Sequence, residues 1–217
     1  MVHWTLFFIQ IGAIITCFCF SLKLLNKRIY PTYMRKFFMY PLFAFLHTIG
    51  VLISLTSPKL YQIGNTLIDF SAVLHYAILA PFIFSIQNPK PFKYVQIFLL
   101  VVGLVYVIYA FSISLKTMNN FITSSASNAL LIIFGIFYFG SILTNPHIGY
   151  LKNDPGFWIV VGILIGMGAA LPIFISMKQI AKAIGGENAS YFRDVAFVSF
   201  TIMYLAFIKA IKCTRTT

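Results

Sequence analysis

Charged residues are scarce in this sequence, and acidic residues are the scarcest of them. Only 9% of the 217 residues are charged and only four are aspartate or glutamate, whereas about 25% of residues are charged in ordinary soluble domains. Hydrophobic residues make up 60%, against about 45–50% in soluble domains. A water-soluble globular protein is therefore excluded. Because a helix needs about 20 apolar residues to cross a hydrocarbon core about 30 Å thick, we expect one all-α membrane domain over residues 1–217 with about eight spans at most.

Motifs for nucleotide chemistry and for disulfide pairing are also missing. No glycine-rich phosphate-binding pattern of the Walker or Rossmann type occurs, and the connections between apolar runs are too short for a folded catalytic domain. The cysteines Cys17, Cys19 and Cys213 are odd in number, so they imply no disulfide framework and are expected to fill apolar space. The N-terminus lacks the basic region and cleavage site of a signal peptide, so the first apolar run is expected to remain as a helix.

Basic residues, in contrast, are in excess. Sixteen lysines and arginines against four acidic residues give a net charge of +12, which in a soluble protein would suggest binding to nucleic acid. In a chain of membrane spans the basic residues instead lie in short loops, where they hold cytoplasmic helix ends against anionic headgroups. Because such loops form no extended basic surface, the expected partner is the lipid bilayer, and no nucleic acid is expected to bind.

Seven apolar runs, separated by charged or proline-containing breaks, are each close to the length of a membrane span. A six-span arrangement would leave one of these runs on the surface, so a seven-transmembrane-helix bundle is favoured. The predicted spans are residues 4–22, 37–57, 67–86, 95–115, 125–143, 157–177 and 195–211.

The distribution of lysine and arginine predicts the orientation of the bundle. Eleven of the sixteen lie on one side, in the first, third and fifth loops and the C-terminal tail, and five lie on the other side. By the positive-inside rule the more basic side is cytoplasmic. The N-terminus is therefore predicted outside and the C-terminus in the cytoplasm, with a cytoplasmic loop over 23–36 and an external loop over 178–194.

Ionisable side chains occur in the second and third predicted spans. His47 lies ten residues from the start of the second span, and His75 lies ten residues from Asn65, just before the third span. Each is therefore about 15 Å deep, so both imidazoles fall at the bilayer midplane if these spans are adjacent. Tyr40 shares a face with His47, and Tyr76 shares one with Asp69. Asp69 is about 120° around the helix from His75 and is not expected to stack on it. Because ionisable residues in spans usually face the bundle interior, these five side chains are the candidate ligand or proton site.

The same side chains also have simpler interpretations. Neutral histidine and tyrosine serve as hydrogen-bond partners between helices, and a haem held by both histidines is another alternative. Asp69 is expected to be a buried partner of a tyrosine or of a helix-terminal amide. No third metal ligand is evident at the midplane, and Lys209 has no nearby carboxylate as a counter-ion for retinal, so neither a metal nor a cofactor is expected.

Small residues recur at every fourth position of the sixth predicted span, at Gly162, Gly166 and Ala170. A face of this kind lets two helices approach closely. Its neighbour is expected to be another span of the same chain, and a homodimer through this span is the alternative.

Residues 154–159, DPGFWI, have the character of an interfacial anchor and a helix start. Together with Gly162, this stretch resembles a segment of small seven-span membrane proteins of Bacteroidota and of the membrane parts of some of their sensor histidine kinases. An aromatic residue often takes the place of Gly166 in that pattern, and this chain departs from it there. The resemblance implies a sensory or partner-binding module in a bacterial cytoplasmic (inner) membrane, and it assigns no catalytic residue.

These observations favour a non-enzymatic sensory or accessory signalling module that acts through a partner. Asp69 is the one carboxylate within the predicted spans, so acids and bases are too few to favour an enzyme. A small solute transporter or channel is one alternative, and an intramembrane enzyme or haem protein is the other. Basic residues of the first loop are expected to contact lipid headgroups or a partner such as a membrane kinase; they are Lys27, Arg28, Arg35 and Lys36.

Overall fold

The structure is a computed structural model that describes residues 2–25, 32–56, 58–87, 93–117, 121–144, 151–184 and 186–213. Among these residues, seven helices are long and apolar enough to cross a membrane. They are α1 (Val2–Ser21), α3 (Met39–Thr56), α4 (Tyr61–Ile86), α5 (Lys93–Thr117), α6 (Phe121–Thr144), α7 (Pro155–Ile184) and α8 (Gly186–Cys213). The shorter elements are η1 (Leu22–Leu25), α2 (Thr32–Lys36), η2 (Pro58–Leu60) and η3 (Leu151–Asn153). The prediction of seven membrane-length helices is confirmed, and these helices are compatible with an integral, multi-pass membrane protein.

Several helices extend beyond the apolar runs that predicted them. Helix α4 begins at Tyr61, six residues before the predicted start of its span at residue 67. The predicted external loop over 178–194 is largely helical, since α7 continues to Ile184 and α8 begins at Gly186. The apolar runs mark only the part of each helix that suits lipid. The helical backbone hydrogen bonds continue beyond them into polar sequence, so the helices are longer than the predicted spans.

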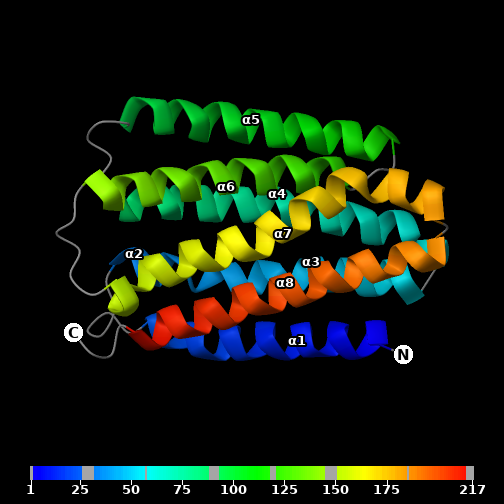
Figure 1. The fold of residues 1–217 in the computed structure, drawn as a ribbon, viewed down its shortest axis with the longest axis horizontal. Helices are drawn as coiled ribbons and strands as arrows, with labels where there is room; N and C mark the ends of the chain where they lie inside the picture. The colour runs from blue at the N-terminus through cyan, green and yellow to red at the C-terminus, as the bar shows by residue number, and fades with distance from the viewer. Residues whose placement is uncertain are drawn as a thin grey trace.

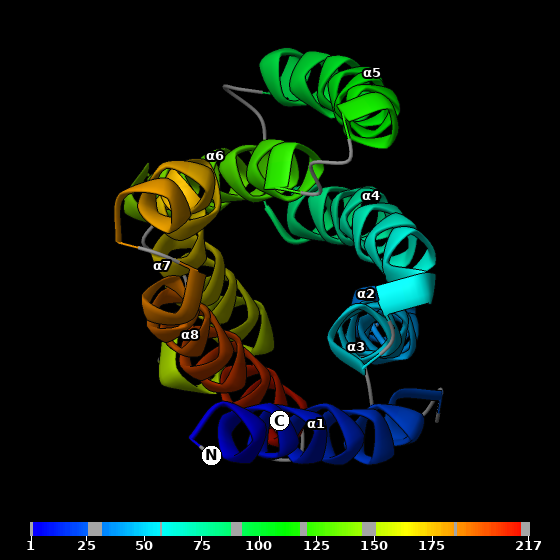
Figure 2. The same ribbon diagram turned by 90° about the vertical axis from the view of Figure 1, so that its right-hand side faces the viewer.

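Six helices form a closed ring. Figure 2 shows α1, α3, α4, α6, α7 and α8 around a common centre, and each of them packs against its two neighbours in that order, with α8 returning to α1. The first and last helices of the chain therefore lie side by side. Figure 1 shows that the N-terminal end of α1 lies at one end of this ring, and the C-terminal end of α8 lies at the other.

Helix α5 lies outside the ring, against α4 and α6 (Figure 2). The Tyr76 hydroxyl of α4 donates a hydrogen bond of 2.9 Å to the Leu99 carbonyl of α5, and it lies so close to Gly103 that an added Cβ would collide with it. Further along α5, the Ser114 hydroxyl donates to the Asp69 carboxylate of α4. The remaining face of α5 is apolar and exposed, as suits contact with lipid; its residues include Tyr94, Val95, Phe98, Val101, Val105, Tyr106 and Tyr109.

Glycines permit the closest contacts within the ring. A Cβ at Gly166 of α7 would lie 2.8 Å from the Met203 Cβ of α8, and one at Gly162 would lie 3.0 Å from the Ala206 Cβ. In the single chain the small-residue face of α7 is thus occupied by α8. A second close approach, which the sequence pattern did not predict, joins α3 to α4, where a Cβ at Gly50 would lie 2.8 Å from the Gly64 carbonyl.

The DPGFWI segment forms the start of α7. The Asp154 carboxylate accepts hydrogen bonds from the backbone N–H groups of Gly156 (2.9 Å) and Phe157 (3.2 Å), which otherwise lack a partner at a helix N-terminus. The Tyr138 hydroxyl donates to the same carboxylate (2.7 Å), and the Trp158 indole N–H donates to the Lys152 carbonyl. The helix start expected here is therefore built as a cap that also ties α7 to α6.

We expect Gly166→Leu to lower the free energy of unfolding by about 1–3 kcal/mol, because overpacking against Met203 forces α7 and α8 apart. Gly168→Leu on the same helix is the matched control, since nothing lies within 4 Å of a Cβ added there, and it should change the stability by no more than about 0.5 kcal/mol. Unfolding of the purified protein in detergent measures both. Equal stability of the two variants would contradict the close packing of α7 on α8 at Gly166.

Candidate functional site

The two predicted histidines meet inside the ring. His47 of α3 and His75 of α4 have ring centroids 6.0 Å apart, as expected if their helices are adjacent. The His47 Nδ1 lies 3.0 Å from the Ser71 hydroxyl, which itself donates to the Ile68 carbonyl. The His75 ring also lies beside the Tyr40 ring, tilted to it, with centroids 5.3 Å apart.

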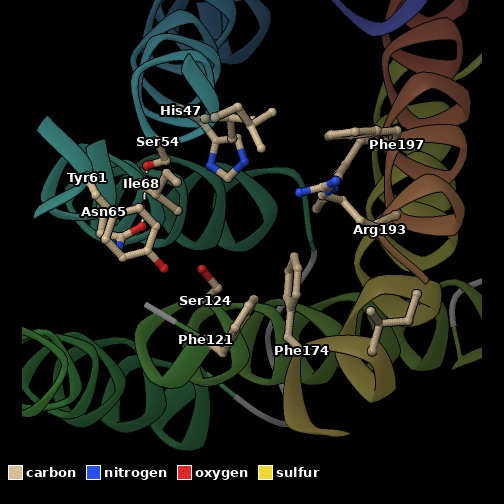
Figure 3. Close-up of a pocket in the computed structure, with 15 residues that line it drawn as sticks. His47, Ser54, Tyr61, Asn65, Ile68, Phe121, Ser124, Phe174, Arg193 and Phe197 are labelled. Atoms are coloured by element: carbon tan, nitrogen blue, oxygen red, sulfur yellow. Dashed lines mark hydrogen bonds between the residues drawn. The ribbon is translucent and has the colours of Figure 1, made fainter. Parts of the chain in front are cut away.

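His47 lines a cavity of about 200 Å³ within the ring. Figure 3 shows the cavity between α3 and α4 on one side and α6, α7 and α8 on the other. Its outermost residues, Leu55, Tyr61 and Phe121, lie near helix ends at the end of the bundle where α1 begins. Aromatic rings form much of the wall; they belong to Tyr61, Phe121, Phe174, Phe197 and Phe200.

Arg193 of α8 supplies the positive charge of the cavity. Figure 3 shows its guanidinium pointing into the cavity toward His47. Its Nε atom is buried and has no hydrogen-bond partner among the described residues. A smaller cavity of about 110 Å³, under Trp4 and Phe7 of α1, also reaches Arg193. A guanidinium in this setting matches a carboxylate or phosphate, with which it forms charge-assisted hydrogen bonds.

The inner end of the cavity is a polar floor, formed by Gln10, His75 and Asn128 from three different helices. A space of about 10 Å³, large enough for about one water molecule, lies between them and adjoins the larger cavity at His47 and Ser124. Gln10 Oε1, His75 Nε2 and Asn128 Nδ2 are buried and lack a hydrogen-bond partner in the described part of the chain. The floor therefore offers both hydrogen-bond donors and acceptors to a group that enters it.

Beyond this floor the ring is filled by an aromatic plug, formed by Phe37, Tyr40, Phe82 and Phe207. The Phe37 ring stacks on Tyr40 at 5.5 Å and meets Phe207 edge-on at 5.1 Å and Phe82 at 5.4 Å. Phe37, Tyr40 and Phe207 are fully buried. The cavity thus reaches one end of the bundle and is blocked toward the other.

Asp69 and Tyr76 do not belong to this cavity. As expected, Asp69 points away from His75, but its partner is Ser114 (2.6 Å) rather than a tyrosine or a helix-terminal amide. Tyr76 bonds to α5. The predicted group of five therefore divides, with His47, His75 and Tyr40 inside the ring and the other two at the contact with α5.

The basic residues predicted to contact headgroups or a partner do not line the cavity where the structure describes them. Lys27 and Arg28 fall outside the described residues, and Arg35 and Lys36 belong to α2, which packs beside η1. Lys209 is exposed, and its Nζ lies 5.9 Å from the centre of the Trp158 ring. Among the described residues, no group of three or more histidine, cysteine or acidic side chains could hold a metal ion.

A comparison with known protein families, curated proteins and solved structures finds no match to this chain.

We expect a cysteine at Ser124, in a cysteine-free background, to react with a membrane-impermeant thiol reagent, because the Ser124 side chain faces the cavity (Figure 3). Ser127→Cys, one turn further along α6, is the matched control and should not react, because Ser127 is buried and does not line the cavity. With the predicted orientation, the reagent acts from outside the cell. Reaction only from the cytoplasmic side would show that the predicted orientation is wrong. No reaction from either side would show that the cavity is closed.

Proposed function

We propose that the chain is a membrane-embedded sensory module that binds a small organic acid in the cavity inside its ring and reports occupancy to a partner protein. The observation that carries the proposal is a cavity with one open end, a guanidinium beside that end and an unsatisfied polar floor. The proposed setting is a bacterial cytoplasmic membrane with the cavity open to the outside.

The cavity favours a ligand with an acidic group and an apolar body. Arg193 favours an anion, while the phenylalanine walls favour aliphatic or aromatic surface. Tyr204, which lies beside the floor, is eleven positions after Arg193 on α8, which corresponds to about 16 Å along the helix. A medium-chain carboxylate has a suitable shape, with its carboxylate at Arg193 and its chain along the phenylalanine walls, above a floor that a water molecule satisfies.

Contacts below the floor offer a route for the signal. His75 at the floor lies against Tyr40, and Tyr40 packs on Phe37 in the aromatic plug. Phe37 directly follows α2, which carries Arg35 and Lys36. A ligand that moves His75 would therefore disturb packing next to the basic first loop. We propose that a membrane kinase or another membrane protein contacts that loop, because the loops hold no catalytic domain of their own.

The aromatic plug favours sensing over transport. A channel needs a continuous path, whereas rings and aliphatic side chains with no exposed surface fill the other half of the ring; they include Leu24, Met34, Phe37, Leu79, Ile83 and Phe207. A transporter would have to open this half in a second conformation. Transport of the ligand is therefore the outcome that most directly opposes the proposal.

We expect octanoate to stabilise the wild-type protein in lipid nanodiscs, by about 2.7 kcal/mol at a concentration one hundred times its Kd. Arg193→Gln should raise the Kd at least about tenfold, because a charge-assisted hydrogen bond contributes about 1.5–3 kcal/mol. Thermal unfolding across an octanoate titration gives both values.

Lys209→Gln is the matched control, since Lys209 is a basic residue at the opposite end of the same helix. It should bind octanoate like the wild type. Equal Kd values for octanoate in the Arg193 and Lys209 variants would show that octanoate does not bind in the cavity. If the wild type instead accumulates labelled octanoate inside liposomes against a gradient, the chain is a transporter and the sensory proposal fails.

A further inference from the structure

A second polar cavity, separate from the one inside the ring, lies between α4 and α5. It has a volume of about 140 Å³, and five of its six lining residues carry side-chain oxygen atoms. Gln62, Asn65, Thr66 and Asp69 come from α4, and Ser114 and Leu115 come from α5. Because Gln62 and Thr66 are exposed near the start of α4, an ion can reach this cavity from the bundle end.

Asp69 provides the charge of this second cavity. Its side chain is only 2% exposed, and its Oδ2 accepts a hydrogen bond of 2.6 Å from Ser114. Its Oδ1 is buried and has no hydrogen-bond partner among the described residues. No lysine or arginine appears among the described residues that line this cavity. A buried carboxylate without a counter-charge is costly, so the cavity is expected to attract a cation.

We propose that this cavity binds a sodium ion, with Asp69 Oδ1 as its charged ligand. Small hard cations prefer oxygen ligands, and the spacing of Asn65 and Asp69, four residues apart, places both on one face of α4. The Thr66 hydroxyl donates to the Gln62 carbonyl, so its oxygen lone pairs remain available to a cation. A single carboxylate balances one positive charge, which favours a monovalent ion over calcium or magnesium.

The cavity is larger than a proton alone would require. Protonation of Asp69 would add one hydrogen to Oδ1, whereas the cavity has room for an ion and a water molecule among several oxygen atoms. The ion would also join α4 to α5, the helix outside the ring. Asn65 lines both cavities, so an ion at Asp69 would lie beside a wall of the proposed ligand site.

The test is thermal unfolding in nanodiscs without octanoate, in sodium, potassium or choline chloride at one ionic strength. The wild type should unfold at a higher temperature in sodium than in either other salt. Asp69→Asn should abolish this difference, while Asp194→Asn, which alters a buried aspartate away from the cavity, should retain it. Ser114→Ala keeps the carboxylate, and it should weaken binding of radioactive sodium several-fold if the Asp69 variant does not fold.

Three results would overturn the sodium site. Equal stabilisation by all three salts would indicate an effect of ionic strength. A dependence on pH with no dependence on sodium would indicate that a proton alone neutralises Asp69. Sodium stabilisation that persists in Asp69→Asn would place the ion elsewhere. Because octanoate is absent, these results are independent of the outcome for the proposed ligand.

Discussion

Contact between the first and the last helix is the constraint on which the rest of this structure depends. Helices α1 and α8 meet at Phe7 and Phe197, whose ring centroids are 5.7 Å apart, and this contact closes the ring of six helices. The close approach of α7 to α8 at Gly162 and Gly166 keeps the ring narrow. Because the ring is closed, side chains that point inward from helices far apart in the sequence lie around one central space.

The two halves of that space are filled in different ways. Toward one end, aromatic and aliphatic side chains pack with no exposed surface and form the plug at Phe37 and Phe207. Toward the other end, Gln10, His75 and Asn128 each have a buried polar atom without a partner among the described residues. Each unsatisfied buried polar group costs about 1–3 kcal/mol, so this floor is stable only when a water molecule or a ligand group satisfies it. This need is the physical basis for interpreting the cavity as a binding site.

The sequence could predict what depends on one helix or on two adjacent helices. Apolar runs located the seven helices, and the spacing of Gly162 and Gly166 predicted a close approach. The depth of His47 and His75 predicted that they lie at one level if their helices are adjacent, and the structure brings the two rings together. The floor could not be predicted, because its residues come from α1, α4 and α6 and no spacing relates them. The position of Arg193 beside the cavity was missed for a similar reason. In the predicted external loop over 178–194 it resembles any other basic residue, and only the structure shows that its guanidinium points into the cavity.

A cryo-electron microscopy structure of the protein in nanodiscs, at a resolution that shows ordered water, is the most direct test of the central claim. The account predicts density between Gln10, His75 and Asn128, from a water molecule or from the polar group of a ligand, within hydrogen-bond distance of all three. An empty floor with these side chains paired to one another would contradict it. So would a ring in which α1 is separated from α8, because the cavity would then open to lipid.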